Sequence, residues 1–358
     1  MDLAVQDDKS ALKRNRIDHF DVADGSVIRY VESCLNYINP ELLYWNSGLK
    51  INNLPAILSE HEGLVDLIQI NNHKRINKHF EAVNRAIATG SYFITSVETK
   101  GTRKTRILNR YPKGFRMIVY SSDVLLHRIF AKLNSTKKFY YTLTEGKNRA
   151  LSLTETLGRL VSCGFEIIDY KQIGHKTYIV TKKVTEPEYD MQPTYGLFCK
   201  LNRVGYKGRL ISFYKLRTMH PYSEYLQEYL YNTNGTHNGD KINSDFRVTS
   251  WGKIFRKFWI DELPMLWNFL KGEIKLVGVR PLSRHKFGTY PDELQEKRIQ
   301  VKPGLVPPFY ADMPDSVEEF YKTEERYLDE YLRRPYWTDF KYFFKAMHNI
   351  FFKRARSR

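Results

Sequence analysis

Residues 260–272 read IDELPMLWNFLKG, and this stretch decides how the second half of the chain is interpreted. An acidic residue before an apolar run, with Pro264 in the first turn, is typical of a helix N-terminus. We therefore expect a helix that Asp261 caps and that ends near Gly272. The adjacent carboxylates of Asp261 and Glu262 can also do chemistry, because a carboxylate can attack phosphorus or help to hold Mg²⁺. Both interpretations stay open on this stretch alone.

A pair of cations precedes the stretch. Residues 197–203 and 209–219 read as the two strands of a hairpin, joined by a turn at 205–208. Lys215 and Arg217 are two positions apart in the second strand, so a period of two places both on one face, where they can hold a phosphate. A solvated strand face is the alternative interpretation of this pair.

A further cation follows the stretch. Residues 274–277 read as a strand, and the sequence GVRP at 278–281 forms a tight turn after it. Such a turn would fix the Arg280 guanidinium for bidentate contact with a phosphate. The positive end of the helix expected at Asp261 would also favour a phosphoryl group beside it.

The order of short motifs in this half is more specific than any single one. The strand motif K-x-R-T-M at 215–219 is followed by D-x-R-V-T at 245–249, G-x-x-x-R-K at 252–257, D-E-L-P at 261–264 and L-V-G-x-R-P-L at 276–282. In this order and spacing, the chain resembles the bacterial sugar transferase family from about residue 195 to residue 304. These are the monotopic polyprenyl-phosphate phosphoglycosyl transferases.

The resemblance implies an α+β catalytic domain that moves a sugar-1-phosphate from a nucleoside-diphosphate sugar to a polyprenyl phosphate, initiating cell-surface polysaccharide or glycoconjugate assembly. It assigns the attack on the donor phosphate to Asp261, with Glu262 as its dyad partner and with Mg²⁺ held by these two carboxylates. Such chemistry needs cations that neutralise the departing phosphate. The phosphate-binding residues that the resemblance implies are Lys215, Arg217, Arg247, Arg256 and Arg280.

The chain departs from this family at the membrane element. Family members have an apolar re-entrant helix before the hairpin, where this chain has the polar connector VTEPEYDMQP at 184–193. Residues 335–358 offer a replacement, because an aromatic stripe next to a basic end is typical of a helix on an anionic membrane surface. Packing of the stripe on the domain core is the alternative. The stripe consists of Trp337, Phe340, Phe343 or Phe344, Met347, Ile350 and Phe351.

The first half alternates helix-like and strand-like segments, which predicts an α/β domain. Its order resembles the second half of a class I methyltransferase fold, a partial Rossmann fold. Residues 1–64 lack the glycine-rich strand-to-helix turn that would hold S-adenosylmethionine, so we expect a non-catalytic docking or scaffolding domain. The expected strands are 91–97, 165–170 and 177–182, and the expected helices are 78–88 and 154–163.

Composition narrows the possible partners. Basic residues exceed acidic ones by 57 − 40 = 17, a charge that attracts anionic lipids and phosphorylated substrates. No helix-turn-helix, finger or RNP-like signature indicates a nucleic acid. The sequence has no apolar run long enough to span a bilayer and no apolar leader, so we expect a cytoplasmic protein, peripheral on the inner face of the bacterial cell membrane. The three cysteines lack the spacing of a disulfide framework or a zinc site.

Two functions remain after these exclusions. The first is the enzyme described above, and the second is a non-catalytic family member that acts as an assembly partner in glycan biosynthesis. Asp261, Glu262, Arg256 and Arg280 are all retained, which favours the enzyme, and a homo-oligomer is compatible with either. The expected organisation is a flexible arm at 1–20, an α/β domain at 21–184, a linker at 185–195 and the sugar transferase domain at 196–358.

Overall fold

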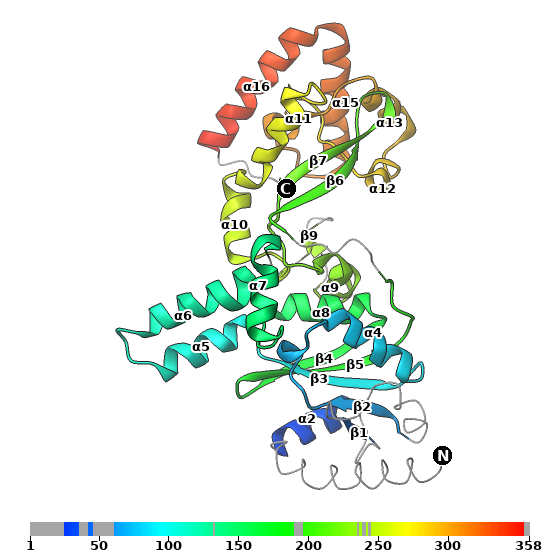
Figure 1. Cartoon of the computed structure of the whole chain (residues 1–358). Helices are drawn as coiled ribbons and strands as arrows, with labels where there is room; N and C mark the ends of the chain where they lie inside the picture. The colour runs from blue at the N-terminus through cyan, green and yellow to red at the C-terminus, as the bar shows by residue number, and fades with distance from the viewer. Residues whose placement is uncertain are drawn as a thin grey trace. The chain divides into compact units, whose positions relative to one another are not determined.

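The chain forms two compact units, Met1–Tyr195 with His220–Tyr229, and Gly196–Met219 with Leu230–Arg358 (Figure 1). The predicted arm at 1–20 and residues 190–195 of the predicted linker lie outside the described residues. The computed structural model describes residues 25–35, 42–45, 61–131, 133–189, 196–234, 236–237, 241–242 and 245–353.

The first unit is built on a mixed five-stranded sheet in the order β1-β2-β3-β5-β4. The first three strands are parallel, and β5 runs antiparallel to both β3 and β4. The strands expected at 91–97, 165–170 and 177–182 are confirmed, the last two as a hairpin. The strand bounds are β1 Leu42–Trp45, β2 Gly63–Asp66, β3 Tyr92–Val97, β4 Phe165–Ile173 and β5 Lys176–Lys183.

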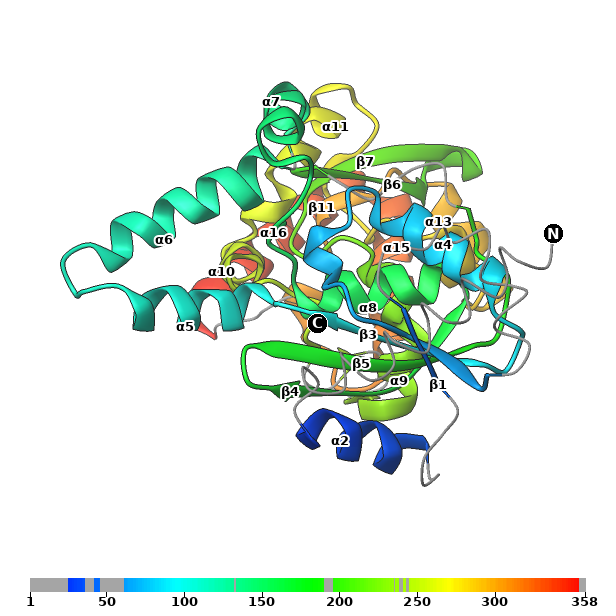
Figure 2. The same ribbon diagram turned by 60° about the horizontal axis from the view of Figure 1, so that its bottom comes forward.

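Helices cover both faces of this sheet, as Figures 1 and 2 show. On one face α2 (Gly25–Leu35) packs Tyr30, Val31 and Leu35 against strand residues that include Ile94 and Val180. On the other face lie α4 (Ile76–Ala86) and α8 (Leu153–Ser162), the two helices expected from the sequence. Helices on both faces explain why β3 is buried along almost its whole length.

A short segment from the second half of the sequence completes the first unit. Residues 220–229 include the 3-10 turn η5 (Ser223–Leu226) and the start of α9 (Gln227–Asn234). The Tyr222 hydroxyl accepts a hydrogen bond from Asn77 at 2.9 Å, and the Arg159 guanidinium lies 4.4 Å from the centroid of the Tyr222 ring. A Cβ on Gly158 of α8 would lie 2.1 Å from the Tyr222 carbonyl oxygen, so only glycine allows this approach.

We predict that Gly158→Ala destabilises the first unit, because its methyl group would clash with the backbone of Tyr222. Overpacking of this kind costs about 1–3 kcal/mol of unfolding free energy, measurable by urea denaturation. Gly101→Ala is the matched control, since Gly101 also lies in a helix but its Cβ would stay 3.7 Å from the nearest atom. Equal stability of the two variants would show that residues 220–229 do not sit against α8.

A helical arm extends away from the sheet of the first unit (Figures 1 and 2). Helices α5 and α6 pack on one another, and a π-helical turn, η3, continues α6 toward α7. The sequence analysis did not anticipate this arm. Its elements are α5 Lys100–Arg110, α6 Arg116–Val124, η3 Leu125–Phe130 and α7 Asn134–Thr144.

The second unit combines two strand pairs with a set of short and long helices. The predicted hairpin is confirmed as β6 (Phe198–Val204) and β7 (Leu210–Leu216). Strand β6 is shifted by one residue from the expected 197–203, and β7 begins one residue later and ends three residues earlier than the expected 209–219. A parallel pair joins β10 (Lys275–Val277) to β11 (Gly304–Val306). The other elements are η4 Tyr206–Gly208, β8 Thr236–His237, β9 Lys241–Ile242, α10 Ser250–Lys257, η6 Ile260–Met265, α11 Leu266–Leu270, α12 Arg284–Phe287, α13 Asp292–Ile299, α14 Phe309–Asp312, α15 Val317–Arg333 and α16 Pro335–Phe352.

The final helix, α16, divides its aromatic residues between the core and the surface. Tyr342 and Ala346 are buried against α14 and α15, and Phe343 and Ile350 pack partly against the same core. The outward side chains are exposed: Trp337, Phe340, Phe344 and Phe351. The predicted stripe is therefore divided, because Phe343 and Ile350 pack partly against the core while its other aromatic side chains are exposed. Within the described residues, no helix is both long and apolar enough to cross a bilayer.

Candidate functional site

The turn that carries the paired carboxylates differs from the prediction. Asp261 does not cap a helix: the capping position belongs to Trp259, and Asp261 lies inside the first turn of η6. Trp259 has a left-handed backbone with φ 53°, an uncommon conformation for a large side chain, and its indole Nε1–H donates to the Tyr310 hydroxyl at 3.0 Å. This turn removes the Asp261 carboxyl from the capping position and buries it.

Asp261 and Glu262 have different surroundings although they are neighbours in sequence. Burial raises the pKa of Asp261, and the adjacent Glu262 raises it further, while Lys215 and Arg256 act in the opposite direction. Glu262 is partly exposed and accepts a hydrogen bond from Lys215 Nζ at 2.6 Å. One carboxyl is thus desolvated among cations, and the other is held in an ion pair.

Thr218, two residues beyond the end of β7, and helix α10 place Arg256 beside Asp261. Thr249 caps α10 and also donates its hydroxyl to the Thr218 carbonyl at 3.0 Å, while Arg256 Nε donates to Thr218 Oγ1 at 2.9 Å. A Cβ on Gly252 would lie 2.2 Å from the Thr218 carbonyl oxygen. The threonine and glycine of the motifs at 245–257 are therefore explained by close packing of α10 on the end of β7.

Arg247 forms a bidentate ion pair with Asp245. Its Nε and one terminal nitrogen donate to the two carboxylate oxygens at 2.9 and 2.8 Å, and its backbone N–H donates to the first oxygen at 3.0 Å. Burial opposes ionisation of Asp245, but these contacts outweigh it and lower the pKa of that carboxyl. Burial also lowers the pKa of Arg256, with Asp261 and Asp245 opposing the shift, so these charged groups form one cluster.

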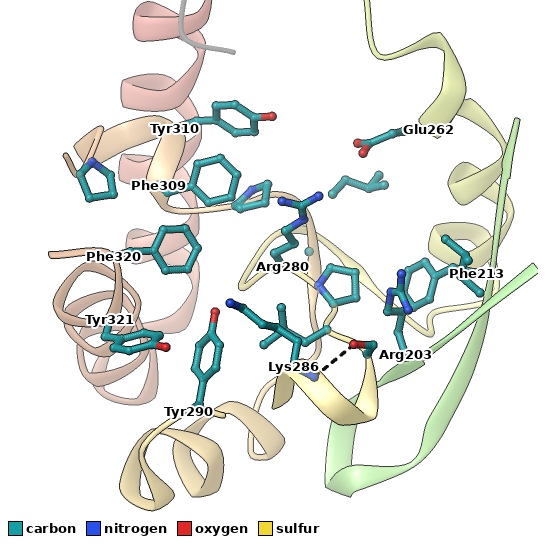
Figure 3. Close-up of a pocket in the computed structure, with 18 of the residues that line it drawn as sticks. Arg203, Phe213, Glu262, Arg280, Lys286, Tyr290, Phe309, Tyr310, Phe320 and Tyr321 are labelled. Atoms are coloured by element: carbon teal, nitrogen blue, oxygen red, sulfur yellow. Dashed lines mark hydrogen bonds between the residues drawn. The ribbon is translucent and has the colours of Figure 1, made fainter. Parts of the chain in front are cut away.

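The backbone around Arg280 is fixed from two sides. Gly278 and Gly304 lie against one another, since a Cβ on Gly304 would come within 2.1 Å of the Gly278 nitrogen. The Arg280 carbonyl accepts a hydrogen bond from Arg298, whose guanidinium also pairs with the fully buried Glu324. The predicted tight turn is thus held rigidly, and the Arg280 side chain points into a cavity (Figure 3).

That cavity has a volume of about 470 Å³ and is lined by cations and aromatic rings. Arg203 and Arg280 lie close enough that Arg280, after burial, lowers the pKa of Arg203. A desolvated guanidinium beside a second one favours an anion between them. Figure 3 shows Glu262, Arg203, Arg280 and Lys286 around the space. The aromatic lining consists of Phe213, Tyr290, Phe309, Tyr310, Phe320 and Tyr321.

Comparison with known proteins gives a family match that covers the second half of the chain. The family model described as Bacterial sugar transferase matches residues 189–353. This half of the chain belongs to that family. Over 144 residues it is 34% identical to the galactosyl transferase CpsE of Streptococcus agalactiae, covering 39% of this chain and 31% of that protein.

Two further relatives extend the comparison. The undecaprenyl-phosphate galactose phosphotransferase of Salmonella typhimurium is 34% identical over 150 residues, which cover 40% of this chain and 31% of that protein. The uncharacterized sugar transferase EpsL of Bacillus subtilis is 37% identical over 109 residues, which cover 30% of this chain and 48% of that protein. The chain thus spans between about a third and a half of the length of these relatives.

The sugar transferase domain does not bring all predicted site residues to the cavity. Lys215, Glu262 and Arg280 line it, whereas the buried Asp261 is not among the described residues that do. Arg217 lies just beyond the end of β7, and its Nε donates to the Gly196 carbonyl at 3.1 Å. Arg247 and Arg256 belong to the cluster around Asp245 and also lie outside the cavity lining.

Sequence reasoning missed Arg203 and Lys286. A signal existed for Arg203, because the hairpin register pairs it with Ile211 and pairs Leu201 with Phe213, which places Arg203 on the face that carries Lys215. Lys286 lies in the four-residue helix α12, where neither periodicity nor a spaced motif marks it. It reaches the cavity only because the chain turns there after Arg280.

We predict that Arg298→Met destabilises the sugar transferase domain by about 3–5 kcal/mol, because Glu324 would be left as a buried charge without its partner. The double variant Arg298→Met with Glu324→Leu should recover most of the loss, since an apolar pair needs no charge compensation. Urea denaturation measures both. A loss below about 1 kcal/mol in the single variant would show that this pair does not hold the Arg280 turn.

Proposed function

We propose that the sugar transferase domain moves a sugar-1-phosphate from a nucleoside-diphosphate sugar to a polyprenyl phosphate through a covalent intermediate on Asp261. The observation that carries the proposal is a buried carboxyl next to a cavity in which Arg203, Arg280 and Lys286 converge. The names of two relatives, a galactosyl transferase and an undecaprenyl-phosphate galactose phosphotransferase, support the same class of reaction.

The first step of this reaction is displacement at the phosphorus that bears the sugar. An oxygen of Asp261 forms a bond to that phosphorus, the bond to the bridging oxygen breaks, and the nucleoside monophosphate leaves with the electron pair. Negative charge grows on the departing phosphate, so the guanidinium groups of Arg203 and Arg280 would stabilise it. Rigid support of the Arg280 backbone keeps this group in place during the step.

The second step regenerates the carboxylate. An oxygen of the polyprenyl phosphate attacks the same phosphorus, the bond to Asp261 breaks, and the product is a polyprenyl diphosphate sugar. Lys215 holds Glu262 at 2.6 Å, which keeps the second carboxylate oriented beside the first. Lys215 also favours the ionised form of Asp261, the form that attacks phosphorus.

Mg²⁺ is the metal that we propose for this site. Asp261 and Glu262 offer hard carboxylate oxygens at consecutive positions, and Mg²⁺ is commonly held by one or two carboxylates together with substrate phosphates. The desolvated Asp261 carboxyl fits a cation partner, because a nearby positive charge would offset the burial that raises its pKa. When bound, the ion would neutralise charge on the diphosphate of the donor.

We also propose that this domain lies on the inner face of the bacterial membrane, where a polyprenyl phosphate would be reached. Exposed apolar side chains occur on α10, on η6 and α11, and on α16, together with exposed lysines such as Lys257 and Lys345. Aromatic residues beside lysines favour an anionic lipid surface. The exposed apolar residues are Ile254, Phe258, Leu263, Leu266, Trp267, Leu270, Trp337, Phe340, Phe344 and Phe351.

The first unit has a different role in this proposal. Its sheet order, with three parallel strands followed by an antiparallel hairpin, is compatible with the second half of a methyltransferase-like fold. We propose a non-catalytic docking module that does not bind S-adenosylmethionine. Micromolar binding of that cofactor in a calorimetric titration of the full chain would contradict this assignment.

We predict that Asp261→Asn lowers release of nucleoside monophosphate by roughly 10³-fold or more, because the amide keeps the side-chain shape but is a poor nucleophile. The assay uses a panel of UDP-sugars with polyprenyl phosphate and follows UMP. The wild-type chain should also show a phosphosugar adduct by intact mass spectrometry. Glu293→Gln on α13 is the control, since this exposed acid lies away from the cavity lining.

Two results would refute this function. Full UMP release by a folded Asp261→Asn protein would exclude the covalent step on Asp261. No release from any UDP-sugar by the wild-type chain would favour the alternative, a non-catalytic assembly partner. Thermal denaturation of each variant separates loss of chemistry from loss of fold.

We predict a pH dependence that reports on Asp261 directly. The ionised carboxylate attacks, and burial raises its pKa, so single-turnover UMP release should rise with pH through a midpoint above the ordinary aspartate value of about 3.9. Glu262→Gln should move the midpoint down and Lys215→Met should move it up, because each removes a charge with the opposite effect on Asp261. A midpoint that neither variant shifts would assign the titration to another group.

A further inference from the structure

A compact cluster of two histidines and one aspartate lies at the carboxyl end of β2 in the first unit, outside the sugar transferase domain. Asp66 is the last residue of β2, His73 follows the 3-10 turn η2 (Ile70–Asn72), and His79 lies in α4. Asp66 Oδ2 lies 2.8 Å from His79 Nε2 and 3.2 Å from His73 Nε2. One potential ligand atom from each side chain lies within 4.8 Å of the other two.

The cluster is buried and is oriented by its neighbours. The Asp66 side chain is 0% exposed, that of His79 is 6% exposed, and that of His73 is 13% exposed. The two imidazole rings stack with centroids 3.7 Å apart, and Trp45 stacks with His79 at a centroid distance of 5.4 Å. Asp66 Oδ1 accepts the Ile68 N–H at 2.9 Å, which leaves Oδ2 for the histidines. Such outer contacts are typical of oriented metal ligands.

Both imidazoles direct the same ring atom to Asp66. Their Nε2 atoms lie 2.8 Å (His79) and 3.2 Å (His73) from the same carboxylate oxygen, Oδ2, so three potential ligand atoms from separate segments converge in one buried place. The set therefore offers two imidazole nitrogens and one carboxylate oxygen, which are common ligands of divalent transition metals.

We propose that Asp66, His73 and His79 bind a divalent transition metal ion, with Zn²⁺ the best match to two imidazoles and one carboxylate. Ligands about 2.0–2.1 Å from a tetrahedral ion lie roughly 3.3 Å apart, close to the 3.2 Å between Asp66 Oδ2 and His73 Nε2. Each ring then keeps its proton on Nδ1 and coordinates through Nε2. Three protein ligands leave a fourth position that water or a small anion can fill.

Metal titration of the full chain, without a polyhistidine tag, tests this site. Co²⁺ serves as the spectroscopic probe, and we expect one equivalent to give visible absorption of tetrahedral type, which Zn²⁺ abolishes by competition. His73→Gln and His79→Gln should each weaken binding at least about 10-fold, the range expected when a ligand or its support is lost. His285→Gln on α12 is the control, because this exposed histidine is remote from the cluster in sequence and lies in the other unit.

His73→Gln is the more informative variant, since His73 is the most exposed ligand and its replacement should leave the fold intact. Zn²⁺ should raise the melting temperature of the wild-type chain and not that of this variant. Absence of stoichiometric Co²⁺ or Zn²⁺ binding, or binding that both glutamine variants leave unchanged, would overturn the proposal. UMP release by the sugar transferase domain is a separate measurement, so failure of one proposal does not imply failure of the other.

Discussion

The left-handed backbone of Trp259 is the constraint on which the sugar transferase domain depends. It reverses the chain between α10 and η6, so the last turn of α10 presents Arg256 and the first turn of η6 presents Asp261. The indole holds this conformation through its hydrogen bond to Tyr310, which belongs to the core around α15 and α16. A strained residue next to a buried carboxyl is a common arrangement at functional sites, because surrounding packing must maintain it.

The sequence predicted the strands well because their signals are local. The hairpin β6–β7 and the strands β3, β4 and β5 each combine a period of two, or a buried run, with a glycine turn. The prediction that Asp261 caps a helix was wrong for a reason that is not local. An acidic residue before Pro264 gives the same sequence signal whether the helical turn begins at Asp261 or, as here, after Trp259 in a left-handed conformation. The tertiary hydrogen bond from Trp259 to Tyr310 favours the second of these two starts.

The site itself could be predicted only in part. Lys215, Glu262 and Arg280 belong to spaced motifs and do line the cavity, but the partner of each depends on the fold. The ion pair of Lys215 with Glu262 joins residues 47 positions apart, and neither periodicity nor motif spacing specifies it. The divided aromatic face of α16 has the same origin, because the sequence marks the residues of a helix stripe but not which of them the neighbouring helices cover.

The short segment 220–229 has a consequence for how the protein folds during its synthesis. The first unit is not contiguous in the chain, since Gly158 and Arg159 on α8 receive Tyr222 from beyond β7. During synthesis, the sheet and helices before residue 190 emerge from the ribosome while the surface of α8 is still uncovered. That surface can be completed only after the first hairpin of the sugar transferase domain has also been translated. The packing of the earlier unit is therefore complete only once part of the later one has been translated.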